Sequence, residues 1–159
     1  MGDTAASDLL RADHRKMEKH LDSLLDALKH LGAERVAEIR RDFGELEKLA
    51  EVHFKQEERV YYPRVRALAP QVMDLMEEQH GVVRETERGL HELLESFSDP
   101  ATQRSLDELH RIGIEFHDAV EVHIIDEEDQ LLKLADQLLT PDEQRSLGAA
   151  MRQVAGAEF

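Results

Sequence analysis

The sequence contains no cysteine, no tryptophan and few aromatic residues, which make up 4% of its 159 positions. The absence of cysteine excludes disulfide bonds, iron–sulfur clusters and zinc sites built on thiolates. The scarcity of aromatic residues leaves little of the material that β-sheets favour. No apolar run approaches the roughly 20 residues of a membrane-spanning helix, and the opening MGDTAASDLLRADH lacks the apolar core of a signal peptide. We therefore expect a cytoplasmic protein without a membrane span.

Positive charge is also scarce, because 35 acidic residues outnumber 20 basic ones and give a formal net charge of −15. Such a charge would repel the phosphates of nucleic acids and anionic membrane surfaces, so we predict neither as a partner. The sequence indicates no particular protein partner. Charged residues at 35% and hydrophobic residues at 41% dominate instead, a balance typical of amphipathic helices. At this length we expect a single domain over residues 1–159.

Apolar residues recur at helical spacing in four long segments, which predicts four amphipathic helices. The first begins after Ser7 and ends at Gly32, the second spans about 34–68, the third begins at Pro70, and the fourth carries apolar positions from Leu109 to Leu134. Pro63 predicts a kink or short break in the second helix. The capping sequence TPDE at 140–143 predicts a short last helix over about 141–155. Short connections favour an all-α, up-down-up-down four-helix bundle with its core over about 8–138.

The motif E-V-H-x-x-x-E-E occurs twice, as EVHFKQEE at 51–58 and as EVHIIDEE at 121–128. A lone histidine precedes each copy on the preceding helix, His14 before His53 and His80 before His123. Each half of the chain therefore predicts a helical hairpin with one histidine on its first helix and His-x-x-x-Glu on its second. We expect two pseudo-symmetric hairpins to pack about a twofold axis and to bring these side chains into one layer.

The spacing within the motif places its histidine and the first glutamate of its Glu-Glu pair on one helix face. A residue four positions on lies about 40° around and about 6 Å along the helix. Burying such groups without partners would cost about 1–3 kcal/mol or more each. Imidazole and carboxylate donors suit iron, zinc, copper or manganese. Six groups exceed the four that one structural zinc takes, which favours two metals with two bridging glutamates. The predicted metal ligands are His14, His53, Glu57, His80, His123 and Glu127.

The pattern of these six residues resembles the hemerythrin-like domain family over about 8–138, as does the run from Glu57-Glu58 to Tyr62-Pro63. The resemblance implies two iron ions in an oxo- or hydroxo-bridged di-iron centre that reacts with O₂, hydrogen peroxide or nitric oxide. Oxygen-carrying members have a further histidine where this chain has Arg84, and an aspartate where it has Glu128. These departures place the chain with a branch that has fewer ligands, and they favour peroxide breakdown, nitric oxide handling or redox sensing over simple oxygen carriage.

Three other interpretations compete with this one. A ferritin-like site needs Glu-x-x-His on two helices, and only Glu77-x-x-His80 fits. A module that binds, buffers or senses iron or O₂ without turnover remains open, and so does a structural bundle with zinc or no metal. The histidines expected on the surface or at its boundary are His20, His30, His91, His110 and His117.

Residues beside the ligands carry further expectations. Glu58 and Glu128 lie about 140° from the ligand face of an ideal helix, which predicts that both are solvated. Tyr61 could line the cavity or simply pack, and Glu87 could support the site or end an apolar stripe. The same step of four residues from His14 and His80 reaches Glu18 and Arg84, and we predict a contact between these two side chains.

Overall fold

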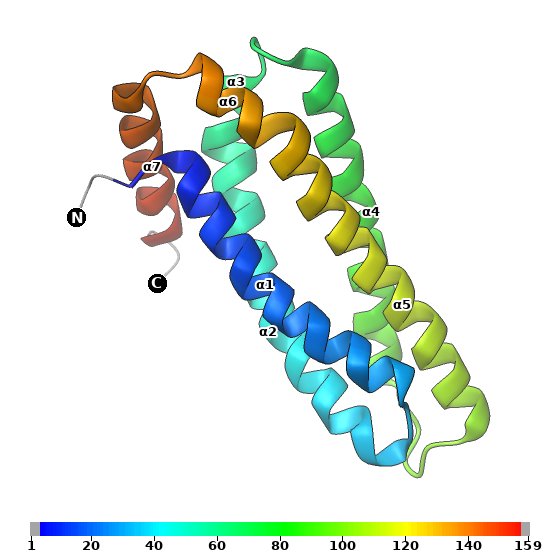
Figure 1. The fold of residues 1–159 in the computed structure, drawn as a ribbon. Coiled ribbons are helices and arrows are strands. Elements are labelled where there is room, and N and C mark those ends of the chain that lie inside the picture. Colours follow the sequence, from blue (N-terminus) through cyan, green and yellow to red (C-terminus); the bar gives the residue numbers. More distant parts are fainter. Residues whose placement is uncertain (1–3, 157–159) are drawn as a thin grey trace.

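The computed structural model describes residues 4–156, and most of them lie in helices (Figure 1). The four long helices are α1 (Ala6–Lys29), α2 (Val36–Gln56), α4 (Pro70–Glu95) and α5 (Gln103–Asp126). Successive long helices run in opposite directions, with the short η1 (Ala33–Arg35) between α1 and α2. Within the described range no residue lies in a strand, which confirms the predicted all-α bundle. The predicted single domain also covers residues 1–3 and 157–159, which lie outside that range.

The two helices that carry the repeated motif share one irregularity. After α2 the chain continues through a π-helical segment, η2 (Glu57–Tyr61), into α3 (Tyr62–Val65), and after α5 it continues through a second one, η3 (Glu127–Leu132), into α6 (Lys133–Leu138). Each π-helical segment begins at the first glutamate of the Glu-Glu pair. Pro63 follows the first segment, but the second contains and adjoins no proline, so proline alone does not account for the irregularity.

Sequence signals explain where several helices begin. Pro70 opens α4 and Pro141 opens α7 (Pro141–Gly156), because the fixed φ of proline suits the first helical turn. At the start of α5, Thr102 Oγ1 accepts a hydrogen bond from the backbone N–H of Ser105 at 3.1 Å, and Ser105 Oγ accepts one from the backbone N–H of Thr102 at 2.9 Å. The predicted cap of the last helix is present, since Thr140 Oγ1 accepts from the Glu143 N–H at 3.1 Å.

The C-terminal helix α7 packs across the end of the bundle where α1 begins (Figure 1). Gln144 on α7 donates from Nε2 to Ser7 Oγ at 3.1 Å. Gln56, the last residue of α2, donates from Nε2 to the carbonyl oxygen of Met151 at 3.0 Å. These buried contacts tie α7 to the helices that enclose the site.

Two apolar clusters fill the bundle, one toward each end. On α1, Leu10 belongs to one cluster and Met17 to the other, and on α4 Met76 and Val83 are divided in the same way. The histidines of these helices fall between the two clusters in sequence, so the bundle has a polar layer between two apolar ones. In the part of the chain that the structure describes, no helix is long and apolar enough to cross a membrane.

Candidate metal centre

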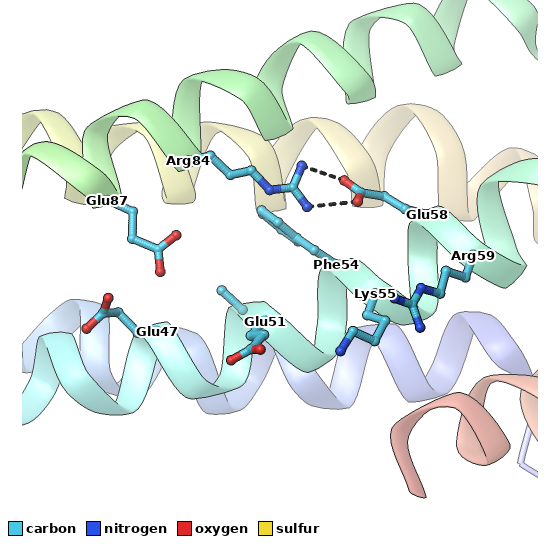
Figure 2. Close-up of a pocket in the computed structure, with 9 residues that line it drawn as sticks. Glu47, Glu51, Phe54, Lys55, Glu58, Arg59, Arg84 and Glu87 are labelled. Carbon is cyan, nitrogen blue, oxygen red and sulfur yellow. Dashed lines mark hydrogen bonds and ion pairs between the residues drawn. The ribbon is translucent and has the colours of Figure 1, made fainter. Parts of the chain in front are cut away.

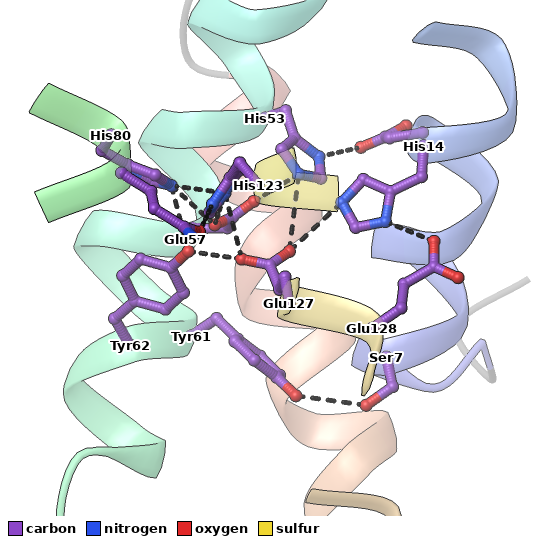
Figure 3. Close-up of polar contacts among 12 residues, drawn as sticks. Ser7, His14, His53, Glu57, Tyr61, Tyr62, His80, His123, Glu127 and Glu128 are labelled. Atoms are coloured by element: carbon purple, nitrogen blue, oxygen red, sulfur yellow. Dashed lines mark hydrogen bonds and ion pairs between the residues drawn. The ribbon is translucent and has the colours of Figure 1, made fainter. Parts of the chain in front are cut away.

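The six predicted ligand residues converge in this polar layer (Figure 3). Each of the four long helices contributes one histidine, and each π-helical segment contributes its first residue, Glu57 or Glu127. None of the six residues is more than 2% exposed. Both copies of the motif therefore place their histidine and the first glutamate of their Glu-Glu pair at one buried site.

The first group of donor atoms comes from the first hairpin and both glutamates, namely His14, His53, Glu57 and Glu127. Nε2 of His14 lies 3.2 Å from Glu127 Oε1, and Nε2 of His53 contacts Glu57 Oε1. Nε2 of His53 also lies 3.9 Å from Glu127 Oε1. The Oε1 atoms of both carboxylates thus face the two imidazoles of the first hairpin.

The second group contains His80 and His123 with the same two glutamates. Nε2 of His80 lies 3.1 Å from Glu57 Oε2, and Nε2 of His123 lies 3.4 Å from Glu127 Oε2. The two imidazole Nε2 atoms are 3.0 Å apart. Each carboxylate therefore turns one oxygen to each histidine pair, which is how a carboxylate bridges two cations.

Four buried atoms of the first group have no hydrogen-bond partner among the described residues: His14 Nε2, His53 Nε2, Glu57 Oε1 and Glu127 Oε1. An unpaired buried polar atom costs about 1–3 kcal/mol, so four together cost about 4–12 kcal/mol. A cation at the point they share would engage all four. The donor set and its unpaired atoms therefore fit a bound metal ion.

The outer nitrogen of each imidazole meets a side-chain oxygen on a neighbouring element. The Nδ1 atoms lie 2.7–3.1 Å from these oxygens, His14 from Glu128, His53 from Asp13, His80 from Glu58 and His123 from Gln79. Since a carboxylate or amide oxygen only accepts, each Nδ1 carries the proton and donates it. That tautomer leaves the Nε2 lone pair directed at the centre, as a metal ligand requires.

Glu58 is exposed and Glu128 partly exposed, in line with their predicted place off the ligand face, but the prediction missed that each contacts an imidazole. The angular argument considered only the inward face of each helix, whereas Nδ1 lies on the flank of an imidazole, where a side chain about 140° off the ligand face can arrive. Glu58 keeps 35% of its side-chain surface exposed while accepting from His80. The contacts with His80 and Arg84 lower the pKa of Glu58 to about 2 despite its partial burial.

The predicted contact between Glu18 and Arg84 is wrong. Arg84 donates from both terminal nitrogens to the two oxygens of Glu58, at 2.7 and 2.8 Å, while Glu18 pairs with Arg15 on its own helix at 3.2 Å. Glu58 presents both carboxylate oxygens to the planar guanidinium of Arg84, and such bidentate charge-assisted pairs are among the strong hydrogen bonds of proteins. Arg84 also lies over the ring of Phe54, 5.4 Å from its centroid.

Tyr62 is a member of the site that the sequence did not single out. Its buried hydroxyl donates to Glu127 Oε2 and lies 3.0 Å from His80 Nε2. Burial and the nearby carboxylates Glu127 and Glu57 hold the pKa of Tyr62 well above its ordinary value, so the phenol stays protonated. Tyr61, for which the sequence leaves lining and plain packing open, is buried with its hydroxyl 3.2 Å from Ser7 Oγ, away from the centre (Figure 3).

The two bridging candidates differ in their titration because His53 acts mainly on Glu57, whereas the charge of Glu57 acts on Glu127. Burial opposes ionisation of Glu57, yet the imidazole of His53 lowers its pKa well below the usual value. Burial and the charge of Glu57 raise the pKa of Glu127 to about 7. A bound cation would stabilise the ionised form of both carboxylates.

A cavity of about 370 Å³ lies beside the centre between α2 and α4 (Figure 2). Phe54 separates it from the donor atoms, since its ring stacks on His80 with centroids 3.8 Å apart and planes 12° apart. The Glu58–Arg84 pair lines the same cavity. Glu87 also lies there, away from the ligands, and its burial and Glu47 raise its pKa to about 7.

The remaining histidines lie outside the central layer. His30, His91 and His110 are exposed and His20 is partly exposed, as expected. His117 is instead buried, at 3% exposure, with its Nδ1 2.9 Å from Asp118 Oδ1 on the same helix. The prediction of a surface or boundary position was therefore wrong for His117 alone among these five.

A helical bundle that buries four imidazoles and two shared carboxylates defines a class of cation-binding bundle. Comparison with known families gives the same class, because the family described as Hemerythrin HHE cation binding domain matches residues 5–135. The chain belongs to this family, which confirms the resemblance in the sequence. No curated protein and no solved structure matches the chain.

Proposed function

We propose that the chain is a non-haem di-iron protein that consumes peroxide or reacts with O₂ or nitric oxide. In this proposal His14 and His53 hold one iron, His80 and His123 hold the other, and Glu57 and Glu127 bridge them. The observation that carries the proposal is the division of six buried donors into two groups that share both carboxylates. Two irons held side by side supply a pair of electrons to a small oxidant.

The residues around the donors favour a small reactant. Phe54 and the Glu58–Arg84 pair stand between the 370 Å³ cavity and the donor atoms, so this cavity gives an organic substrate no broad opening to the centre. Apolar clusters flank the layer on both sides. Both features suit a diatomic molecule or peroxide better than a larger compound.

The Tyr62 hydroxyl is a proton donor beside the second histidine pair. Its hydroxyl holds a proton at hydrogen-bond distance from His80 Nε2 and donates to Glu127 Oε2. Because the raised pKa keeps this proton on the phenol at neutral pH, Tyr62 is suited to orient a bound oxygen-containing molecule by donating to it.

Metal analysis and the optical spectrum test the proposal directly. Protein expressed with adequate iron should contain two irons per chain and show the near-ultraviolet bands of a bridged ferric pair. It should consume hydrogen peroxide catalytically, and Glu57→Gln or Glu127→Gln should abolish that activity. One zinc per chain without such bands would refute the di-iron centre. Reversible O₂ binding without peroxide consumption would instead identify a carrier or sensor.

A further inference from the structure

The acceptors behind the four imidazoles follow the repeat of the chain. Asp13 immediately precedes His14, and Gln79 immediately precedes His80. Asp13 accepts from Nδ1 of His53 at 3.1 Å, and Gln79 Oε1 accepts from Nδ1 of His123 at 3.0 Å. The two residues therefore have equivalent places in the two hairpins. One of them is a carboxylate and the other a neutral amide.

The other two acceptors do not break the symmetry in this way. Glu128 accepts from Nδ1 of His14 and also binds Arg15, while Glu58 accepts from Nδ1 of His80 and also binds Arg84. Each histidine pair thus has one carboxylate that an arginine contacts. Among these acceptors, the difference in charge between the two pairs reduces to Asp13 against Gln79.

This difference changes how strongly each pair binds a cation. A carboxylate that accepts from an imidazole raises the basicity of the ligating nitrogen and adds a negative charge near the metal. An amide raises that basicity less and adds no charge. Gln79 in turn donates from Nε2 to Asp126 Oδ2 at 2.6 Å. The corresponding charge in the second hairpin is therefore one residue further from the centre.

The inner atoms of the site differ in the same direction. All four buried atoms without a hydrogen-bond partner face the His14 and His53 side. On the other side, the Tyr62 hydroxyl donates to Glu127 Oε2 and the two imidazole Nε2 atoms lie 3.0 Å apart. Without a cation, one carboxylate oxygen of the second group still accepts from the Tyr62 hydroxyl, whereas none of the four inner atoms of the first group has a hydrogen-bond partner among the described residues.

We propose that the two metal positions are inequivalent and that the Asp13/Gln79 pair sets their order. The His14/His53 position fills first and holds its metal. The His80/His123 position binds its metal more weakly and exchanges it. The proposal rests on the proposed metal binding and adds which position is labile. The labile position is the one beside Tyr62, so the metal that exchanges is also the one nearest the proton donor.

Titration of the metal-free chain with Co²⁺, read by its visible spectrum and by competition with a chelator, tests the order. The wild-type chain should bind two equivalents in steps separated by about tenfold or more in affinity. The hyperfine-shifted Nδ1–H signals of His14 and His53 should appear in the NMR spectrum with the first equivalent, and those of His80 and His123 with the second.

The decisive variant is Gln79→Glu combined with Asp126→Asn. It keeps the net charge and the hydrogen bond between positions 79 and 126, since the asparagine amide donates to the new carboxylate, but it moves the negative charge next to His123. The weaker step should tighten by about tenfold and merge with the first. Asp126→Asn alone should leave the separation in place, and Asp13→Asn should weaken the first step.

Two equal steps in the wild-type chain, or an unchanged separation in the double variant with both metals still bound, would overturn the inference. Circular dichroism of each metal-free variant shows whether it is folded, so lost binding is not mistaken for unfolding. Failure of the wild-type chain to bind any metal would overturn the proposed function itself, and this inference with it, which distinguishes the two failures.

Discussion

Removing the metal should destabilise the fold by an amount that the structure allows us to estimate. Four buried atoms lose their partner when the cation leaves, at about 1–3 kcal/mol each, so the unfolding free energy should fall by about 4–12 kcal/mol. This is comparable with the whole stability of an ordinary domain, about 5–15 kcal/mol. At about 2–4 °C per kcal/mol, the melting temperature should fall by at least about 8 °C.

A paired substitution separates this cause from a general loss of contacts. His53→Leu with Glu57→Met replaces two of the four unpaired atoms by apolar groups of similar size, and such replacements are close to neutral or stabilising. The metal-free double variant should therefore be close in stability to the metal-free wild-type chain, and metal should stabilise it much less than it stabilises the wild-type chain.

A control with the same residue types is available on α4, where His91 and Glu95 form an exposed pair at the same spacing, 3.0 Å apart. His91→Leu with Glu95→Met should change stability by no more than about 0.5 kcal/mol and should leave the stabilisation by metal intact. Urea and thermal unfolding followed by circular dichroism, with and without chelator, give all these values. The reasoning fails if the metal-free and metal-loaded chains are equally stable, or if the surface pair reduces the stabilisation by metal as much as the buried one does.

Three further predictions concern residues next to the ligands. Tyr62→Phe should retain both metals and slow peroxide consumption, and an unchanged rate would remove Tyr62 from the chemistry. Arg84→Ala should leave Glu58 on His80 but weaken metal binding less than Glu58→Gln does, as equilibrium dialysis would show. Burial and Glu47 raise the pKa of Glu87 from 4.5 to about 7, so the folded state holds this proton more tightly and the unfolding free energy should fall as pH rises through that window. Glu87→Gln should abolish that fall, about 1 kcal/mol after solvent screening, in urea unfolding at about pH 5 and pH 8, whereas exposed Glu92→Gln should preserve it.

The fold and the gathering of the six donors were predictable because both depend on the periodicity of side chains. Leu10, Met17, Met76 and Val83 occupy the inward positions that the helical spacing assigns to them. A histidine among such residues must also face inward, so the ligand residues that each hairpin contributes could be predicted from the sequence. The repeat then determined which histidines would share a group.

The π-helical segments were not predictable, because they depend on backbone hydrogen bonds that the pattern of side chains does not reveal. The wider turn alters which later residue faces the centre, and this explains why Tyr62 and not Tyr61 reaches Glu127. The error at Glu18 had another origin. An argument from pseudo-symmetry placed Arg84 opposite Glu18, while Glu58 offered a nearer carboxylate with better geometry.

The second glutamate of each Glu-Glu pair explains why the motif extends beyond His-x-x-x-Glu. Glu58 belongs to the first hairpin and accepts from His80 of the second, while Glu128 belongs to the second and accepts from His14 of the first. Within each pair, the first carboxylate faces the centre and the second orients a histidine of the other hairpin. Neither hairpin therefore supplies all the acceptors for its own histidine pair, because one Nδ1 in each pair donates to a glutamate of the other hairpin. Docking of the two hairpins and assembly of the metal site are consequently the same event.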